Sequence, residues 1–189
     1  MPFYYSLPIR AQMKNISFKT DVLPMKDKLF RLAFRITLNQ QDAEDVVQET
    51  LIKIWNRRDH WDEIESLEGW AMTIARNMAL DVIRKQDSHR TVSLDEPSPN
   101  NQQPTPIPQH PSPTTPYEQM MEKERIAMVR NLMNSLPEKQ RTAMQLRDFE
   151  DKSYKEIAEI MQISEDQVKI NIFRARQFIK KSYDSLQDN

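Results

Sequence analysis

The sequence contains no cysteine, a single glycine and only three histidines. Without cysteine, a disulfide framework and a thiolate site for metal or catalysis are excluded. Sheet proteins need glycine at their tight turns, so a chain of 189 residues with Gly69 as its one glycine is predicted to be all-α. No apolar run approaches the roughly 18 residues that span a membrane, which predicts no direct membrane insertion. The N-terminus also lacks the long apolar segment of a signal peptide, so we expect a cytoplasmic protein.

Residues that could carry catalysis are sparse and scattered along the chain. His60, His89 and His110 lie far apart in the sequence, and no nucleophile–base pair or metal-ligand spacing accompanies them. We therefore expect no catalytic residues, no cofactor and no metal site. An enzyme is the weakest of the possible functional classes.

Proline is concentrated in one segment. Eight of the twelve prolines fall between Pro97 and Pro116, among serine, threonine, asparagine and glutamine. Such a segment cannot bury enough apolar surface to offset the entropy lost on ordering, so it is predicted to be a flexible linker. The predicted domains are a disordered N-terminal arm at 1–17, a helical domain at 18–92, the proline-rich linker at 93–117 and a second helical domain at 118–186.

Apolar residues at spacings of three and four predict amphipathic helices over 25–38, 42–58 and 67–84. The helix over 42–58 starts with acidic residues and ends with basic ones, which suits the helix dipole. Its outer face is either simply solvated or a docking surface. The residues on that outer face are Asp45, Gln48, Glu49 and Ile52.

A loop that contains Trp61 precedes the third predicted helix, and the helix itself carries a polar stripe. Aromatic residues beside basic and amide side chains suit single-stranded DNA, whose unpaired bases can stack or enter pockets. Ordinary ion pairs along a solvated helix are the alternative. The stripe consists of Arg76, Asn77, Asp81, Arg84 and Lys85.

Near the C-terminus two short amphipathic helices are predicted in close succession. Ser153 and Ser164 each begin a capping box, with Glu156 and Gln167 as the respective partners. A short helix, a tight turn and a longer basic helix form the helix-turn-helix pattern. From 164 to 181 there are five basic residues against two acidic ones. A solvated helix hairpin remains the alternative to DNA binding. The outward face of the second helix carries Gln167, Ile170, Asn171 and Arg174.

Three stretches taken in order, "DAEDVVQETLIKIW", "LEGWAMTIARNMALDVIRK" and "LPEKQRTAMQLRDFEDKSYKEIAEIMQISEDQVKINIFRARQFIK", resemble a bacterial RNA polymerase sigma factor. The absence of further sigma domains between the two modules resembles the extracytoplasmic-function (ECF) subgroup. The resemblance covers about residues 18 to 185. It implies a non-catalytic initiation factor with core RNA polymerase and promoter DNA as partners, and an anti-sigma factor that masks both modules.

The resemblance also implies roles for matching positions. The acidic helix would dock on the clamp coiled coil of the polymerase large subunit, through Asp45, Gln48, Glu49 and Ile52. The loop and third helix would capture the melted −10 element, through Trp61, Ser66, Arg76, Asn77, Asp81, Arg84 and Lys85. The last helix would read the −35 element in the major groove, through Gln167, Lys169, Ile170, Asn171 and Arg174.

Two positions depart from the family pattern. Gln162 stands where a turn glycine is usual, and Gln167 stands where threonine is frequent. Because a left-handed conformation at Gln162 would cost about 1 kcal/mol, we expect a slightly different turn there.

Two other functions stay open at this point: a stand-alone helix-turn-helix regulator with an N-terminal sensor module, and a helical adaptor without a nucleic-acid partner.

Overall fold

The computed structural model describes residues 16–92 and 116–187, and every regular element within those ranges is helical. This confirms the all-α prediction. The predicted linker up to residue 115, and the predicted arm apart from Ile16 and Ser17, lie outside the described residues. In chain order the elements are η1 (Phe18–Val22), η2 (Leu23–Met25), α1 (Lys26–Thr37), α2 (Gln40–Asn56), η3 (Arg58–Glu63), α3 (Leu67–Val92), α4 (Pro116–Asn134), α5 (Glu138–Met144), η4 (Gln145–Phe149), α6 (Tyr154–Met161) and α7 (Glu165–Gln187).

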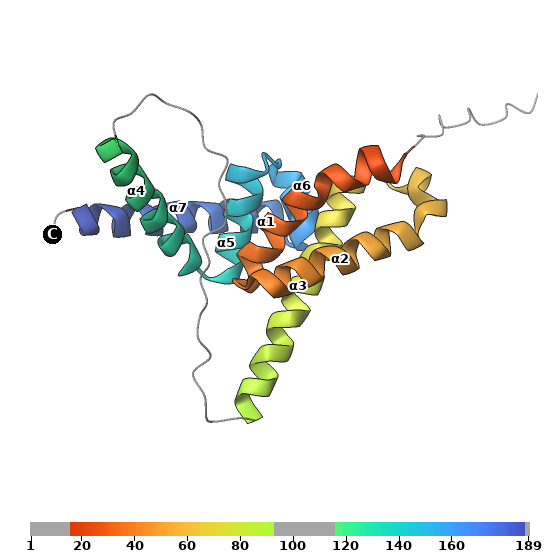
Figure 1. Cartoon of the computed structure of the whole chain (residues 1–189), viewed down its shortest axis with the longest axis horizontal. Coiled ribbons are helices and arrows are strands. Elements are labelled where there is room, and N and C mark those ends of the chain that lie inside the picture. Colours follow the sequence, from red (N-terminus) through yellow and green to blue (C-terminus); the bar gives the residue numbers. More distant parts are fainter. Residues whose placement is uncertain (1–15, 93–115, 188–189) are drawn as a thin grey trace, which may run out of the picture.

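The first module consists of α1, α2 and α3, which pack against one another around an apolar core (Figure 1). The buried apolar residues of each helix recur at spacings of three and four, whereas Trp55, an apolar position of the pattern in α2, is exposed. Asn39 caps α2, because its side-chain oxygen accepts a hydrogen bond from the backbone N–H of Asp42 at 3.2 Å. The buried apolar residues of these helices include Leu29, Leu32, Ala33, Ile36, Ala43, Val46, Val47, Ile54, Ala71, Met72, Ala75 and Ala79.

The second module consists of α4, α5, η4, α6 and α7. The long helix α7 packs against α4, α5 and α6, and apolar residues of α6 and α7 are buried in this module. Pro137 is the N-cap residue, immediately before the first residue of α5. Proline is most frequent at the first position inside a helix, so Pro137 stands one residue before that place. The buried apolar residues of α6 and α7 are Ile157, Ile160, Met161, Val168, Ile172 and Ala175.

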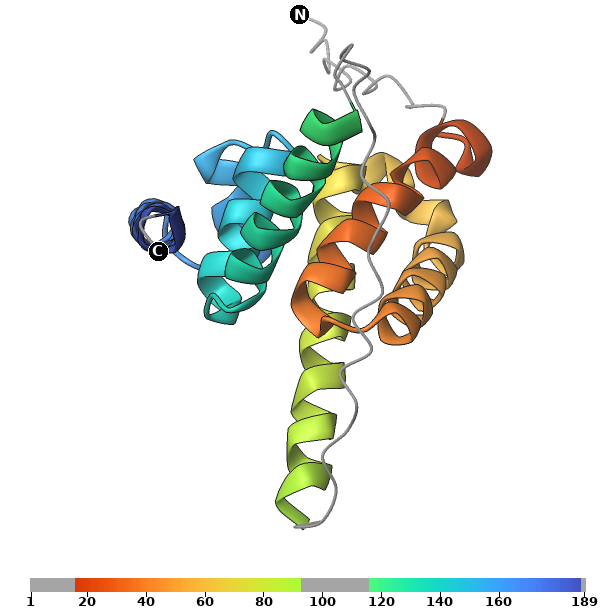
Figure 2. The ribbon, with the colours of Figure 1, turned by 60° about the vertical axis from the view of Figure 1, so that its left-hand side comes forward.

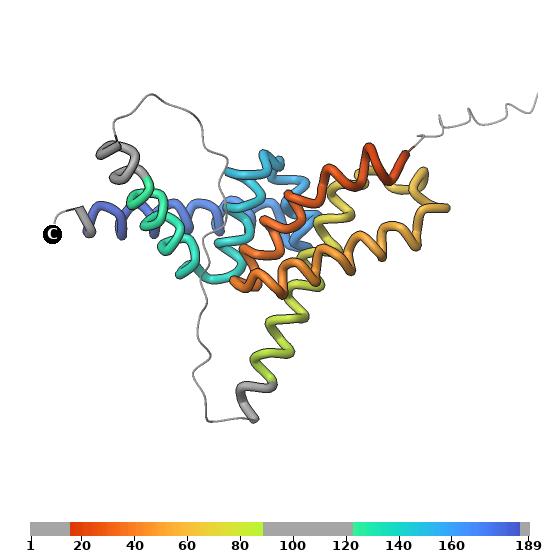
Figure 3. Tube along the Cα trace, in the orientation of Figure 1, coloured from red at the N-terminus to blue at the C-terminus, as the bar shows by residue number. Residues whose placement is uncertain are grey.

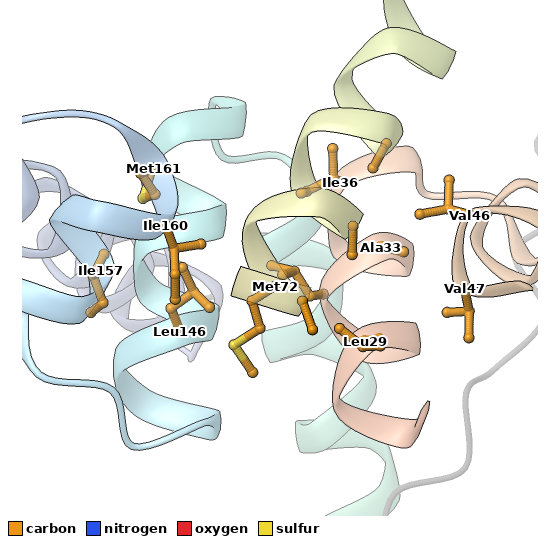
Figure 4. Close-up of a cluster of buried hydrophobic side chains, with 14 of the residues drawn as sticks. Leu29, Ala33, Ile36, Val46, Val47, Met72, Leu146, Ile157, Ile160 and Met161 are labelled. Carbon is orange, nitrogen blue, oxygen red and sulfur yellow. The ribbon is translucent and has the colours of Figure 1, made fainter. Parts of the chain in front are cut away.

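The two modules lie side by side in this structure (Figures 1 and 2). Helix α3 contacts α6, and α1 contacts α5 and η4. Figure 4 shows Met72 of α3 between Leu29 of α1 and the pair Leu146 and Ile160 of the second module. The buried residues therefore form one continuous cluster across both modules. The sequence alone did not predict this contact.

Within residues 16–92 and 116–187, three residues other than glycine adopt left-handed backbone conformations: Leu38, Asp151 and Gln162, with φ of 56°, 52° and 56°. Leu38 and Gln162 are the C-cap residues of α1 and α6, and Asp151 lies between η4 and α6. Figure 3 shows the path of the chain from helix to helix. The single glycine lies inside α3 instead. The chain thus makes its sharp turns without the residue best suited to them.

Candidate nucleic-acid and protein interfaces

The acidic face predicted on α2 is present on the surface. Asp45, Gln48, Glu49 and Ile52 are all exposed, and the side chain of Ile52 is 58% accessible. On the opposite side of the same helix, Val46, Val47 and Ile54 are buried in the core. The helix therefore holds three polar side chains and one apolar side chain on a rigid, outward-facing stripe.

Next to this face lies an apolar hollow lined by Phe18, Leu51, Ile52 and Trp55. The ring of Phe18 meets the ring of Trp55 edge-on at 5.2 Å, and the guanidinium of Arg58 lies 5.0 Å from the Trp55 ring centre. Trp55 belongs to the apolar pattern of α2, yet 46% of it is exposed. Phe18 was not singled out in the sequence, because nothing in the pattern places η1 against the end of α2.

Trp61, interpreted as a loop residue open to a DNA base, is buried with 6% of its surface exposed. It lies in the 3-10 segment η3, and its indole N–H donates to the carbonyl of Ile54 at 3.0 Å. This contact closes η3 onto the end of α2. The sequence suggested an exposed ring because the surrounding residues are polar; as folded, the ring packs in the core and no base can stack on it.

Replacing the Trp61 indole tests this packing role. Trp61→Phe is expected to lower the free energy of unfolding by about 1 to 3 kcal/mol, since the Ile54 carbonyl loses the indole donor and keeps the backbone N–H of Arg57, and a gap remains. Urea denaturation followed by helical circular dichroism measures the change. If stability were unchanged while binding to melted −10 DNA fell, the original DNA-binding interpretation of Trp61 would be restored.

The polar stripe of α3 divides into an exposed part and a buried part. Asp81, Arg84 and Lys85 are exposed, and Arg84 donates to Asp81 at 3.0 Å. Asn77 is half-buried. Ser66 lies just before α3, where its hydroxyl accepts a hydrogen bond from the backbone N–H of Gly69 at 3.1 Å. Most of the predicted stripe is accordingly accessible from solvent, with Ser66 also serving as a helix cap.

Arg76 is the exception on this stripe, because only 6% of it is exposed. Its guanidinium points toward the second module and lies 3.9 Å from a carboxylate oxygen of Glu138. Burial lowers the pKa of Arg76, with Glu138 opposing the shift and Arg84 adding to it. Its Nε has no hydrogen-bond partner among the described residues. Sequence reasoning placed Arg76 on an open face, since the spacing cannot show that another module covers it.

The predicted helix-turn-helix is formed by α6 and α7. Both predicted capping boxes are present: Ser153 pairs with Glu156, and Ser164 exchanges two 3.2 Å hydrogen bonds with Gln167. The turn residue Gln162 is left-handed, with φ 56° and ψ 46°, so the expectation of a different turn was wrong. The left-handed conformation of Gln162 is strained, and it persists because the buried residues of α6 and α7 hold the two helices in place.

This strain gives a second test. Gln162→Gly is expected to raise the free energy of unfolding by about 0.5 kcal/mol, since the relief of left-handed strain exceeds the entropy cost of glycine. Chemical denaturation with a fitted midpoint and slope measures the change. Gln162→Ala, which keeps the strain and loses only an exposed side chain, is the matched control. Equal stability of the two variants would contradict the argument.

The outer face of α7 presents the residues predicted to read duplex DNA. Gln167, Lys169, Ile170 and Arg174 are exposed, and Asn171 is half-buried. Several of their polar groups already have local partners: Lys169 pairs with Asp166 at 3.1 Å, and Asn171 donates to the carbonyl of Gln167 at 2.8 Å.

Two further residues on α7 were not included in the predicted reading face. Phe173, next to Arg174, is 61% exposed. Arg176 forms an ion pair with Asp148 of η4, which ties α7 to the preceding segment. The spacing of Ile170, Phe173 and Arg174 could have indicated a shared outer face, because residues three and four apart are neighbours on a helix.

Among the described residues, no group of three or more histidine, aspartate or glutamate side chains could hold a metal ion. No helix within the described ranges is both long and apolar enough to cross a membrane. The described surface offers exposed helix faces, one acidic with an apolar patch and two with basic and amide side chains. Such faces are suited to binding macromolecules.

Comparisons with known proteins agree with this class. Residues 22–89 match Sigma-70 region 2, and residues 126–179 match Sigma-70, region 4. The chain is 31% identical over 175 residues to the RNA polymerase sigma-H factor of Pseudomonas aeruginosa, covering 90% of this chain and 88% of that protein. It is 30% identical over 155 residues to the ECF sigma factor SigM of Bacillus subtilis, covering 82% and 88%. With SigE of Mycolicibacterium smegmatis it shares 32% identity over 155 residues, covering 82% of this chain and 56% of SigE.

Several solved structures share the fold, and two of them are seen with a bound partner. The sigma factor RpoE of Bartonella quintana, in complex with the anti-sigma factor NepR, superimposes with a TM-score of 0.65 at 24% identity, covering 87% of this chain and 94% of that one. CnrH, in complex with the cytosolic domain of CnrY, gives a TM-score of 0.57 at 20% identity, covering 86% and 84%.

The fold and the two matched regions define a transcription initiation factor of the sigma-70 type. The chain belongs to the ECF RNA polymerase sigma factors, and as such it acts in transcription initiation. The match of the N-terminal module to region 2 disfavours the stand-alone regulator, which would carry a sensor module there.

Proposed function

We propose that this protein binds core RNA polymerase through the outer face of α2 and directs it to a subset of promoters. The observation that carries the proposal is that Asp45, Glu49 and Ile52 share one exposed face beside the apolar hollow at Trp55. Carboxylates around exposed apolar side chains suit a basic, amphipathic partner such as a coiled coil. The protein would act in the cytoplasm, where core polymerase and promoters are found.

The promoter would be read at two places. The exposed face of α7, with Ile170 and Arg174, would enter the major groove of the −35 duplex, where arginine can pair with guanine and isoleucine can contact a thymine methyl. The accessible part of the α3 stripe, with Asn77, Arg84 and Lys85, would hold the separated −10 strand. Both assignments rest on exposure, charge and their place in regions 2 and 4.

An anti-sigma factor is the proposed inhibitor. RpoE and CnrH, the two neighbours in fold, are each seen with a bound partner, which is an anti-sigma factor in the case of RpoE. For this chain the exposed Phe173 and Phe178 of α7 provide apolar side chains that such a partner could cover.

The direct experiment is reconstitution. The purified protein is mixed with core RNA polymerase that lacks any sigma factor, and transcripts from genomic DNA are sequenced. We expect discrete start sites that share two upstream elements. The absence of a stable polymerase complex and of specific starts, with duplex DNA still bound by the protein alone, would support the stand-alone regulator instead.

A further inference from the structure

At the contact between the modules, the carboxylate of Glu150 accepts hydrogen bonds from side chains of both modules. The guanidinium of Arg31 on α1 donates two hydrogen bonds to Glu150, from Nε to Oε1 at 2.8 Å and from Nη2 to Oε2 at 2.7 Å. Gln145 donates to the same carboxylate at 3.1 Å. The Glu150 side chain is only 1% exposed. Planar, two-point recognition of this kind is how arginine binds carboxylates and phosphates alike.

Another arginine of α1, Arg35, lies half-buried at the same contact, and no carboxylate of the described residues is bonded to it. Arg35 donates to the amide oxygens of Gln145 at 3.2 Å and Asn134 at 2.9 Å. Burial, together with the nearby charges of Arg141 and Arg130, lowers the pKa of Arg35 to about 10. Neutral amide oxygens satisfy its hydrogen bonds but do not balance its charge. A desolvated guanidinium of this kind is better matched to an anionic partner.

The cations of the first module share one side. Lys28, Arg31 and Arg35 follow the spacing of three and four on α1, so they form one stripe. The neighbouring helix α3 adds Arg76, which is buried, lies 3.9 Å from Glu138 and has an unsatisfied Nε. Against these four cations the same surface of the first module offers Glu68, which pairs with Lys28 and with Lys152 of the second module.

We propose that Lys28, Arg31, Arg35 and Arg76 form a binding surface for the phosphate backbone of promoter DNA, and that Glu138 and Glu150 occupy this surface while the modules are in contact. The proposal extends the proposed DNA-binding role of the first module and rests on it. In this state the two carboxylates take the places of phosphate groups. The side chains of Lys28 and Arg31 stay partly exposed in this state, whereas Arg76 is covered, so DNA can reach the whole surface only when the second module moves away.

DNA fits this surface better than an acidic protein does, because the surface continues along the proposed DNA-binding helix. Arg84 lies about two turns beyond Arg76 on α3, is exposed and pairs with Asp81 at 3.0 Å. Desolvation is the main cause that lowers the pKa of Arg76, and the charge of Arg84 also contributes to lowering it. From Lys28 to Arg84 the cations span the side of α1 and a neighbouring stretch of α3. Contacts of this kind position a nucleic acid without reading its sequence.

The first test measures competition. Binding of the full chain to a fluorescently labelled single-stranded oligonucleotide of mixed sequence is followed by anisotropy. The variant Glu138→Gln/Glu150→Gln is expected to bind roughly fivefold more tightly than the unmodified chain, because the competing carboxylates are neutralised and a larger fraction of molecules is open. The matched control is Glu124→Gln/Glu159→Gln, which removes the same charge at exposed positions of the second module. If the control variant bound the oligonucleotide equally more tightly, the gain would be due to the change in net charge. The proposal that Glu138 and Glu150 compete with DNA would then be wrong.

The second test counts phosphate contacts. In the Glu138→Gln/Glu150→Gln background, Arg31→Gln/Arg35→Gln is expected to flatten the plot of log affinity against log salt concentration by about 1.4, or about 0.7 for each lost contact. Lys53→Gln/Arg57→Gln removes two exposed cations from α2 and its C-cap, away from this surface, and should leave the slope nearly unchanged. A slope that stays the same in the arginine variant would overturn the phosphate assignment.

A conservative pair of substitutions separates this role from simple structural support. Arg31→Lys/Arg35→Lys in the otherwise unmodified chain keeps both charges for phosphate but loses the two-point bond to Glu150. We expect tighter DNA binding, whereas a merely structural role for these arginines predicts weaker binding or no change, and either of those results would contradict the proposal. Core polymerase binding is measured for every variant. If the unmodified chain binds core polymerase but the arginine variant shows an unchanged salt slope, only the proposed phosphate-binding surface is rejected. If the unmodified chain does not bind core polymerase, the proposed function itself is rejected.

Discussion

Reversing the charge of the acidic face, with Asp45→Lys/Glu49→Lys, is expected to weaken binding to core RNA polymerase by about a hundredfold. Both carboxylates are exposed on the face of α2 that also carries Ile52, so the substitutions place two cations where a basic partner surface is expected to dock. Like charges at an interface cost far more than the loss of a favourable pair. Fluorescence titration of labelled protein with core polymerase measures the dissociation constant.

The control for this result is Glu159→Lys together with Glu124→Lys, which makes the same change in net charge on exposed positions of the second module. Thermal unfolding of each variant shows whether the fold is kept, and the exposed positions of α2 make a large loss of stability unexpected. Unchanged affinity in the α2 variant would reject the assignment of this face. A loss that appears equally in the control would point to long-range charge instead.

The second large effect is expected on the other module. Arg174→Ala should reduce transcription that depends on the −35 element by about ten- to a hundredfold, the range for losing one good base or phosphate contact. Arg174 is exposed on α7 next to Ile170 and Phe173, so its truncation is expected to change the stability of the second module little. Transcription in vitro from a promoter identified by reconstitution, with and without its −35 element, measures the effect.

Polymerase binding should be intact in this variant, because the acidic face lies on α2 of the other module. Lys180→Ala removes an exposed cation nearer the end of α7 and is expected to change transcription much less. Equal loss of polymerase binding and of transcription in Arg174→Ala would indicate unfolding. A loss that persists on a promoter without a −35 element would show that Arg174 does not read that element.

The helices of both modules could be predicted because their apolar spacing agrees with their caps. Asn39, Ser153 and Ser164 stand where the described helices begin, and the buried positions follow the spacing of three and four. A local pattern is sufficient here, since each helix start is determined by residues within one turn of it.

The tryptophans show where a local pattern fails. Trp55 has inward spacing and is exposed, whereas Trp61 has polar neighbours and is buried. Both outcomes depend on η3, which folds back so that Trp61 donates to Ile54 and leaves Trp55 at the edge beside Phe18. A short irregular segment of this kind leaves no periodic signal in the sequence.

The contact between the modules is the part that could not be predicted. Arg31 and Glu150 are 119 residues apart, and their pairing depends on the placement of whole helices rather than on any local rule. The charges themselves were visible in the sequence, but on a helix surface a charged stripe is most often solvated. The assignment of the site residues to polymerase and DNA remains a prediction, which the experiments above test.

The ion pairs between the modules have a consequence for how the protein responds to ionic strength. Added salt weakens DNA binding by competing for phosphates, and it also weakens pairs such as Arg31–Glu150 and Lys152–Glu68 that hold the modules together. The two effects oppose each other, because a less stable contact leaves more molecules open. The unmodified chain should therefore keep a more constant occupancy of its promoters across changing salt than an always-open variant would. The contact between the modules would thus reduce the salt dependence of promoter binding, in addition to limiting access of DNA to the first module.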